Sequence, residues 1–186
     1  MVYTARVKGS GWVLCIGGFR AGAVSDVDRL LDSLEGAVSP QLFQVFDADR
    51  VAGWEHLYFA AVNAVKAFEA GSAVSKSLAI EVLLYASCQD QIKRAFKILG
   101  LSPSTEQVAL LVMADGAEEA ERAFERASGL IGTEDDTVLL VDDEKFEKQR
   151  RVYSVSDLEL EAVGGPRNAA LTSLLIERGA LLPVHR

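Results

Sequence analysis

Apolar and polar positions along this chain follow the two periods that distinguish strands from helices. Short apolar runs rich in β-forming residues predict strands, and apolar residues three and four positions apart predict amphipathic helices. The predicted strands cover residues 12–17, 41–46, 107–113 and 137–141. The predicted helices cover residues 27–36, 55–70, 78–87, 90–99, 116–128, 156–163 and 166–178. The polar segment 142–151 is expected to be a solvated helix or loop.

This order of elements predicts an α/β (α+β) fold, with a mixed sheet of four or five strands and a helical layer. A length of 186 residues fits a single domain spanning residues 1–186. The helical layer is expected to contain three consecutive helices from the middle of the chain, because no strand interrupts residues 55–99.

The second of these central helices, residues 78–87, is apolar around most of its circumference, and Glu81 is its only charge. A helix of this kind lies inside a fold or against a partner. Burial within the domain is the favoured interpretation, and an apolar patch that contacts a protein partner is the alternative. Ser87 and Asp90 have the spacing of a capping box, which predicts where the third central helix begins.

The charge of the chain limits the kinds of partner that it can have. A net charge of −8 disfavours strong non-specific binding to nucleic acid. Residues 101–163 carry six basic and sixteen acidic side chains, whereas residues 47–100 carry six of each. A modest contact with a polyanion is therefore expected at the central helices, provided that the acidic block faces away from them.

The apolar segments indicate a soluble, cytoplasmic protein with no membrane contact. No apolar run approaches the ~18–20 residues that a membrane span requires. The first residues lack the basic segment and apolar core of a secretory signal. Cys15 and Cys88 match no metal-ligand spacing and are expected to be buried free thiols.

Two groups of residues are candidates for enzyme chemistry. Gly17–Gly22 lies between a strand and a helix, but its glycine order is neither a dinucleotide fingerprint nor a P-loop, which favours an ordinary turn. Asp47, Asp49 and His56 are close in sequence, although a turn cap and a structural histidine explain them more simply than a metal site. We therefore expect no enzyme activity, catalytic residue, metal or cofactor. A small-molecule enzyme that uses the Gly17–Gly22 turn is the alternative.

Basic side chains on the central helices indicate a different kind of site. Each set by itself is most simply a solvated helix face, but sets that point the same way would form a small basic pocket. Such a pocket suits one or two phosphates of a single-stranded nucleic-acid end. The predicted RNA-binding residues are Arg50, His56, Lys66, Lys76, Arg94 and Lys97. The bases are expected to stack on Tyr58, Phe59 or Tyr85.

The same stretch of the chain also carries a family pattern. Its residues are Asp47-Ala48, Val51, Gly53, His56-Leu57, Ala60, Ala64, Ala67, Phe68, Lys76-Ser77-Leu78, Glu81, Leu83-Leu84-Tyr85, Gln91-Ile92, Ala95 and Gly100-Leu101. A weaker match in register covers Ile176-Glu177-Arg178, Ala180 and Leu181. This pattern resembles the family of small kinase-binding subunits of the KEOPS complex (PRPK-binding, TPRKB-like proteins), most closely its archaeal-type members. Asp90 departs from the family, in which a basic residue is common at that position.

The resemblance implies a non-catalytic, regulatory subunit of the machinery that adds threonylcarbamoyl to the adenosine next to the anticodon of ANN-decoding tRNAs. It implies two partners, the N-lobe of a PRPK-type atypical kinase/ATPase and, in archaeal members, the single-stranded 3′ CCA end of tRNA. The predicted kinase-facing residues are Leu83, Leu84, Ile92, Phe96 and Leu99. A protein scaffold that binds the kinase and has no affinity for RNA is the remaining alternative.

Overall fold

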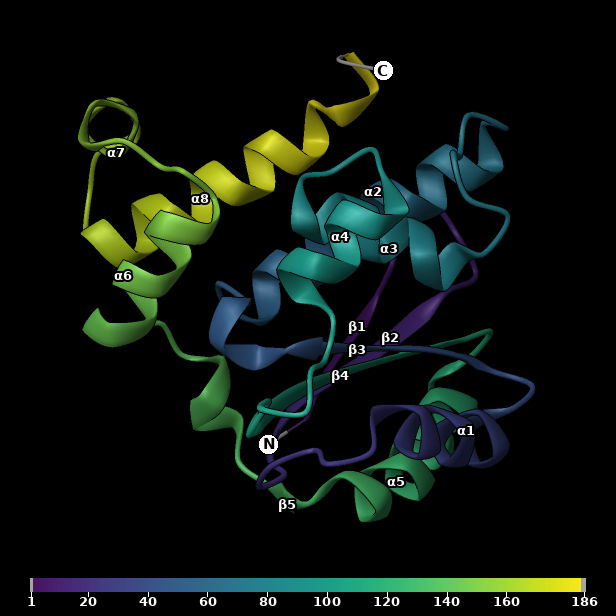
Figure 1. Cartoon of the computed structure of the whole chain (residues 1–186). Helices are drawn as coiled ribbons and strands as arrows, with labels where there is room; N and C mark the ends of the chain where they lie inside the picture. The colour runs from purple at the N-terminus through teal and green to yellow at the C-terminus, as the bar shows by residue number, and fades with distance from the viewer. Residues whose placement is uncertain (1, 185–186) are drawn as a thin grey trace.

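An antiparallel sheet forms the middle of the computed structural model, which describes residues 2–184 (Figure 1). The strands are β1 (Tyr3–Arg6), β2 (Val13–Arg20), β3 (Leu42–Asp47) and β4 (Gln107–Ala114), in the spatial order β1-β2-β4-β3. A fifth strand, β5 (Thr133–Glu134), pairs with the end of β2. Every strand pair is antiparallel. The expected size of the sheet is confirmed, whereas the expected mixture of strand directions is wrong.

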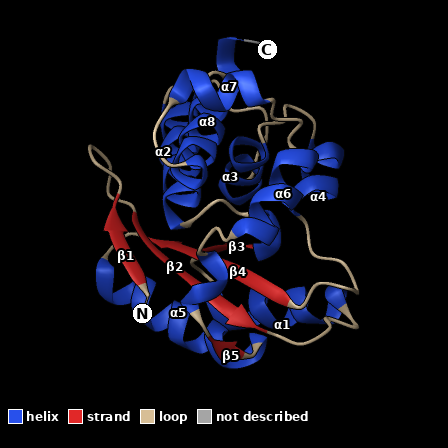
Figure 2. Ribbon diagram, turned by 90° about the vertical axis from the view of Figure 1, so that its left-hand side faces the viewer, coloured by secondary structure: helices blue, strands red, loops and turns tan. Residues whose placement is uncertain are grey.

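Helices cover both faces of the sheet, as Figure 2 shows. One face is covered by α1 (Val27–Val38) and α5 (Ala117–Ile131). The helices on the other side are α2 (Trp54–Glu69), α3 (Leu78–Ser87), α4 (Ile92–Leu99), α6 (Asp143–Val152), α7 (Asp157–Val163) and α8 (Arg167–Ala180). Three short 3₁₀ turns complete the chain: η1 (Ala48–Arg50), η2 (Asp136–Leu139) and η3 (Leu182–Val184). The predicted α+β class is therefore confirmed.

Successive residues of a strand point alternately into two hydrophobic cores, one on each face of the sheet. In β4 the even-numbered residues from Val108 to Val112 face α1 and α5, and the odd-numbered residues from Ala109 to Met113 face the helices of the opposite layer. Successive side chains of a strand point to opposite faces, so a sheet covered on both sides needs apolar residues at every position. This double burial explains why the strand appears in the sequence as one continuous apolar run.

Two glycines of the Gly17–Gly22 segment, which was predicted to form a strand-to-helix turn, are part of β2. Gly17 and Gly18 pair with β4 in the regular register. A Cβ on Gly17 would lie 2.6 Å from the ring of Phe124, and a Cβ on Gly18 would lie 2.5 Å from the side chain of Val138. The two glycines thus allow α5 and η2 to lie directly on the strand. The predicted turn over Gly17–Gly22 is wrong in its first part.

Two other strand assignments differ from the sequence expectation. Residues 137–141 form no strand, and most of them belong to η2, whose start is capped by Asp135 accepting from the amide of Thr137 at 3.0 Å. Local capping chemistry therefore outweighed the β propensity of this apolar run. β1 was not predicted, because it has only four residues and an alternating exposure pattern.

The boundary between the second and third central helices also differs from its prediction. The third helix begins at Ile92, after Gln91, which makes no side-chain capping hydrogen bond. Ser87 is buried in the last turn of α3, where its hydroxyl donates to the carbonyl of Leu84. The capping box predicted for Ser87 and Asp90 is wrong, because Ser87 completes the preceding helix.

The polar segment predicted as a solvated helix or loop is α6, and one of its sides is buried. Phe146 packs into a small core with α8. The side-chain amide of Gln149 donates to the carbonyl of Val51 at 2.9 Å, and the ammonium of Lys145 donates to the carbonyl of Val138 at 2.5 Å. These polar contacts join α6 to η1 and η2.

Two further expectations concern membrane spans and thiols. Among the helices of residues 2–184, none combines the length and apolarity of a membrane-spanning helix.

Cys15 is buried, Cys88 is partly buried, and both are free thiols. Burial raises the pKa of Cys88 to about 12, so its sulfur stays protonated at neutral pH.

Candidate functional site

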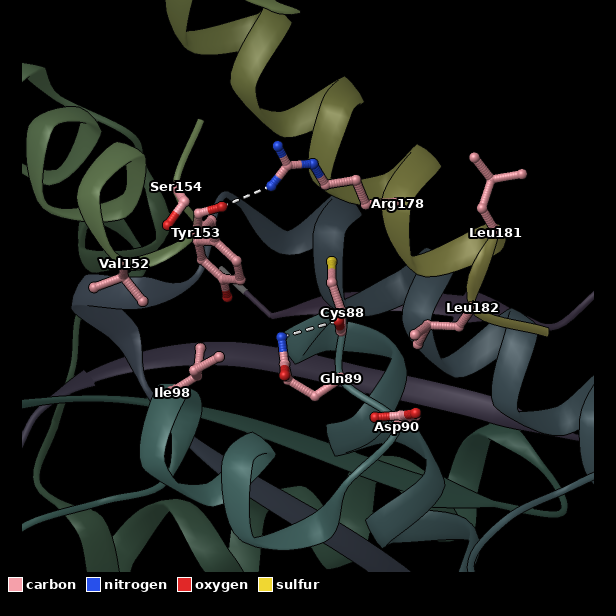
Figure 3. Close-up of a pocket in the computed structure, with 10 residues that line it drawn as sticks. All are labelled: Cys88, Gln89, Asp90, Ile98, Val152, Tyr153, Ser154, Arg178, Leu181 and Leu182. Atoms are coloured by element: carbon pink, nitrogen blue, oxygen red, sulfur yellow. Dashed lines mark hydrogen bonds between the residues drawn. The ribbon is translucent and has the colours of Figure 1, made fainter. Parts of the chain in front are cut away.

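Two adjoining cavities of about 430 and 480 Å³ lie along α4. Both are lined by Gln89, Ile98 and Val152, and together they form one depression, called here the α4 groove. The first cavity is also lined by Cys88, Asp90, Tyr153, Ser154, Arg178, Leu181 and Leu182 (Figure 3). The second is also lined by Arg50, Arg94 and Lys97. The groove therefore lies where α3, α4, η1, α6 and α8 meet.

The corner between α3 and α4 forms one rim of the groove. Cys88 ends α3 in the left-handed conformation, with φ of 54°, and the amide of Gln89 donates to the carbonyl of Leu84 at 3.0 Å. This is the hydrogen-bond pattern of a Schellman closure, which satisfies the last carbonyl groups of a helix and turns the chain sharply. The side-chain amide of Gln89 donates to the carbonyl of Cys88 across the corner (Figure 3). The local geometry thus fixes how α4 leaves α3.

Arg50 holds the opposite end of α4 in place. Its Nη1 donates to the carbonyl oxygens of Lys97 and Ile98, at 2.8 Å each, and its Nε lies 3.4 Å from a carboxylate oxygen of Asp47. The last carbonyl groups of a helix carry partial negative charge and have no partner within the helix. The guanidinium of Arg50 therefore caps α4 and contributes positive charge to the groove.

Tyr153 and Arg178 form the α6–α8 wall of the groove. The phenol of Tyr153 donates to the carbonyl of Arg50 at 3.1 Å, and burial raises its pKa well above the usual value. Arg178 donates to the carbonyl of Tyr153 at 2.6 Å, as Figure 3 shows, and pairs with Glu159 at 2.5 Å. These contacts fix the C-terminal helix against the region around α4.

The groove gathers basic side chains from distant parts of the sequence. Three of the six predicted RNA-binding residues line it, namely Arg50, Arg94 and Lys97. Arg178 also lines the groove and was not among the predicted site residues, although it belongs to the C-terminal part of the family pattern. Arg94 and Lys97 are exposed and form no ion pair within residues 2–184, so their charges are available to a ligand.

His56, which was predicted to contact RNA, lies in the interior with 1% of its surface exposed. Its Nδ1 accepts from the amide of Ala52 at 3.2 Å, so Nε2 carries the proton that is donated to the carbonyl of Ala86 at 2.8 Å. Burial lowers its pKa to about 4. The prediction of a surface contact is wrong, because the ring is buried, with Nδ1 bonded to the segment before α2 and Nε2 joining α2 to α3.

The other two predicted RNA-binding residues do not line the α4 groove. Lys66 is exposed near the end of α2, and Lys76 is exposed in the loop that follows this helix. Neither is among the residues that line either cavity of the groove. A role for them in RNA binding stays a prediction, and it would require a ligand that extends beyond the groove.

The predicted kinase-facing residues divide into two groups. Leu83, Leu84 and Leu99 are fully buried, because α3 packs against its neighbours on all sides and α4 turns Leu99 inwards. Ile92 and Phe96 are 41% and 43% exposed on the outer side of α4. The three leucines are therefore core residues, and burial is the correct interpretation of the apolar α3.

The aromatic residues expected to stack with bases lie away from the groove. Tyr85 is buried in α3. Tyr58 and Phe59 belong to α2, and the phenol of Tyr58 donates to the carbonyl of Arg6 in β1. Stacking on Tyr85 is excluded by its burial, and the apolar lining of the groove comes instead from Ile98, Val152 and Leu181.

The residues considered for a metal or acid–base site have separate partners. Asp47 caps η1 and lies near Arg50, whereas Asp49 pairs with Lys148 at 2.9 Å. Within residues 2–184, no three His, Cys, Asp or Glu side chains are grouped so that they can hold a metal ion. The simpler interpretation as structural residues accounts for each of them.

The acidic block, residues 101–163, is only partly separated from the groove. Its glutamates Glu118, Glu119, Glu121 and Glu125 are exposed on α5, which covers the opposite face of the sheet (Figure 2). The remaining acidic residues of the block include those of α6 and α7, on the same side as the groove. The expected separation of charge is therefore confirmed for α5 alone.

Known proteins include relatives of this chain. Residues 23–178 match the family "Kinase binding protein CGI-121". The "Regulatory protein Cgi121" of Methanocaldococcus jannaschii is 32% identical over 114 residues, which cover 61% of this chain and 70% of that protein. The matched region contains η1, α3, α4, α6 and nearly all of α8, and thus most of the elements that build the α4 groove. The chain belongs to the CGI-121 family of kinase-binding proteins.

Proposed function

We propose that this protein is a tRNA-binding accessory subunit of the KEOPS complex, in which it couples a PRPK-type kinase/ATPase to tRNA during threonylcarbamoyladenosine formation. The α4 groove is the RNA-binding site in this proposal, and the 3′ CCA end is the part of the tRNA that enters it. The outer side of α4 contacts the kinase.

The observation that carries the RNA proposal is the convergence of Arg50, Arg94 and Lys97 on one cavity. Arg94 and Lys97 reach solvent without an ion-pair partner among the described residues, which suits them to phosphate groups. A single-stranded end leaves its bases free to lie against apolar surface, and Ile98 and Val152 supply such a surface beside the cations. The groove thus combines positive charge for the phosphates with apolar surface for the bases, and proteins bind single strands through these two kinds of contact.

The kinase contact is supported by the family and by the outer side of α4. Ile92 and Phe96 lie one helical turn apart and are both about half exposed, so they form one apolar strip. Half-buried large apolar residues on one helix face are suited to a protein partner. The proposed kinase contact and the RNA groove would then be two sides of the same helix.

The RNA proposal is tested with the purified protein and two forms of one tRNA, with and without the CCA end. The proposal predicts a marked loss of binding when the CCA end is removed. Equal binding of both forms would contradict the 3′-end assignment, and the absence of tRNA binding in a protein that still binds the kinase would favour a pure scaffold.

A further inference from the structure

A separate cavity of about 220 Å³ lies apart from the α4 groove and shares no lining residue with it. It is bounded by β1, the first turn of α2, the segment after η2 and the first turns of α8. Pockets for drug-sized ligands have volumes of roughly 300–1,000 Å³. The smaller cavity is therefore suited to one side chain or to a small ligand of similar size.

One wall of this cavity is aromatic. The rings of Tyr3 and Trp54 are stacked, with centroids 4.9 Å apart and an angle of 9° between the ring planes. Both residues are partly exposed. The faces of such rings carry partial negative charge and attract cations.

An unpaired carboxylate forms another part of the wall. The carboxylate of Glu55 makes no hydrogen bond or ion pair with any residue in the described range 2–184. A carboxylate without a partner is complementary to a cation that donates hydrogen bonds.

The balance of charge around the cavity also favours a cation. Burial and then the negative charges of Asp136 and Glu55 raise the pKa of Tyr3. The amino-terminal ends of α2 and α8 lie nearby, and each carries about half a positive charge. Glu55 supplies the one carboxylate of the lining, and the residues that line the cavity include no lysine or arginine.

We propose that this cavity binds an alkylammonium or alkylguanidinium group, which pairs with Glu55 and lies against the Tyr3–Trp54 wall. The ligand is the end of a lysine or arginine side chain of a protein partner, or a free amine of the same shape. The site is independent of the tRNA-binding proposal, because it uses none of the residues of the α4 groove.

The fluorescence of Trp54 provides a direct test. The chain contains two tryptophans, so the substitution Trp12→Phe leaves Trp54 as the single emitter in the full-length protein. The protein is titrated with n-butylammonium and with agmatine, and separately with 1-butanol and with sodium butyrate at matched ionic strength. The proposal predicts a saturable change in emission with the two cations and none with the neutral or anionic analogue.

Two matched variants assign the response to the pocket. Glu55→Gln removes the carboxylate and is expected to weaken binding of both cations by roughly tenfold or more, because a charge-assisted contact is lost. Glu69→Gln removes an exposed carboxylate at the other end of α2 and should leave the affinity unchanged. Unchanged affinity in Glu55→Gln would overturn the proposal, and so would saturable binding of butyrate, which would show that the helix termini dominate.

The source of the cation is distinguished by repeating the titration on the complex with the kinase. Loss of the response in the complex, together with weaker kinase binding by Glu55→Gln, would identify a side chain of that partner as the ligand. Retention of the response, with kinase binding unchanged in Glu55→Gln, would identify a free amine.

Discussion

His56 shows how a single residue can be misassigned when only its type and position are known. An imidazole beside two aspartates resembles a functional group, yet its ring lies in the core and both nitrogens contact backbone groups. Buried polar groups in proteins are almost always hydrogen-bonded in this way. The nearby Arg50 is also partly structural, because it caps the end of α4. For both residues, the hydrogen-bond partners show a structural role that the residue type alone does not reveal.

The lowered pKa of His56 predicts a specific dependence of stability on pH. The folded-state pKa of about 4 lies below the unfolded value of 6.5. The unfolded chain therefore binds a proton first, and stability that is present above pH 6.5 is lost as the pH falls towards 4. The loss attributable to this group is about 3 kcal/mol, taking 1.36 kcal/mol per pKa unit.

This prediction is measured by urea unfolding of the wild-type protein and of His56→Gln between pH 4 and pH 7. All other titrating groups are common to the two proteins. The difference between their unfolding free energies at each pH therefore gives the contribution of His56. The wild type should lose more stability than the variant as the pH falls. A difference that does not change with pH would show that the histidine is accessible or already charged.

At the scale of elements, α3 and α4 differ in apolar content and in role: α3 is apolar around most of its circumference, whereas α4 has one apolar side. α3 lies in the centre of its layer and buries nearly all of its residues, whereas α4 lies at the edge and exposes Ile92 and Phe96. The substitution Leu84→Glu would place a charge in the core and would report on folding alone. Tests of partner binding therefore belong on the outer side of α4.

We expect Phe96→Glu to abolish co-purification with the kinase and to leave the protein folded. The side chain is about half exposed, so the new carboxylate reaches water in the free protein and would be desolvated in the complex. Leu158→Glu is the matched control, because Leu158 is 77% exposed on α7, away from the predicted contact. Wild-type kinase binding by Phe96→Glu, or equal loss in both variants, would remove α4 from the interface.

Two glycines, one in β2 and one in α1, should respond in opposite ways to substitution by alanine. Gly17→Ala places a methyl group against Phe124 and should lower the unfolding free energy by about 1–3 kcal/mol. Gly36→Ala meets no atom within 4 Å and lies within α1, so it should raise stability by about 0.5–1 kcal/mol. Thermal unfolding of the two variants compares them directly. Equal effects would contradict the close packing of α5 on β2.

Most elements could be predicted because their apolar periodicity reflects burial directly. The central helices and the double-sided strands β2 and β4 are examples, since each turns apolar residues towards one or both cores. Some failures arise from local contacts, such as the capping of η2 by Asp135, and others arise from contacts between segments distant in sequence. The glycines of β2 are understood only with α5 and η2 in place, and Arg178 becomes part of the groove only when α8 packs beside α6.

At the scale of the whole molecule, the fold carries an uneven distribution of charge. The glutamates of α5 lie on the opposite side of the sheet from the groove, where Arg94 and Lys97 are exposed without ion-pair partners among residues 2–184. A protein with a net charge of −8 can bind RNA only where local positive charge exceeds this background. Such binding should be weak in the free chain and sensitive to salt.

The assignment of the α4 groove as the RNA-binding site is tested by the affinity of the purified protein for tRNA as a function of salt concentration. Three phosphate contacts to single-stranded RNA predict a slope of about −2 in a plot of log affinity against log salt. The double substitution Arg94→Glu/Lys97→Glu should abolish measurable binding. The pair Lys8→Glu/Arg122→Glu makes the same change of charge on exposed residues outside the groove. It should leave the affinity within about twofold of the wild type, because neither residue lines the groove. Equal weakening by both pairs, or a wild-type affinity that does not depend on salt, would contradict the α4 groove as the RNA-binding site.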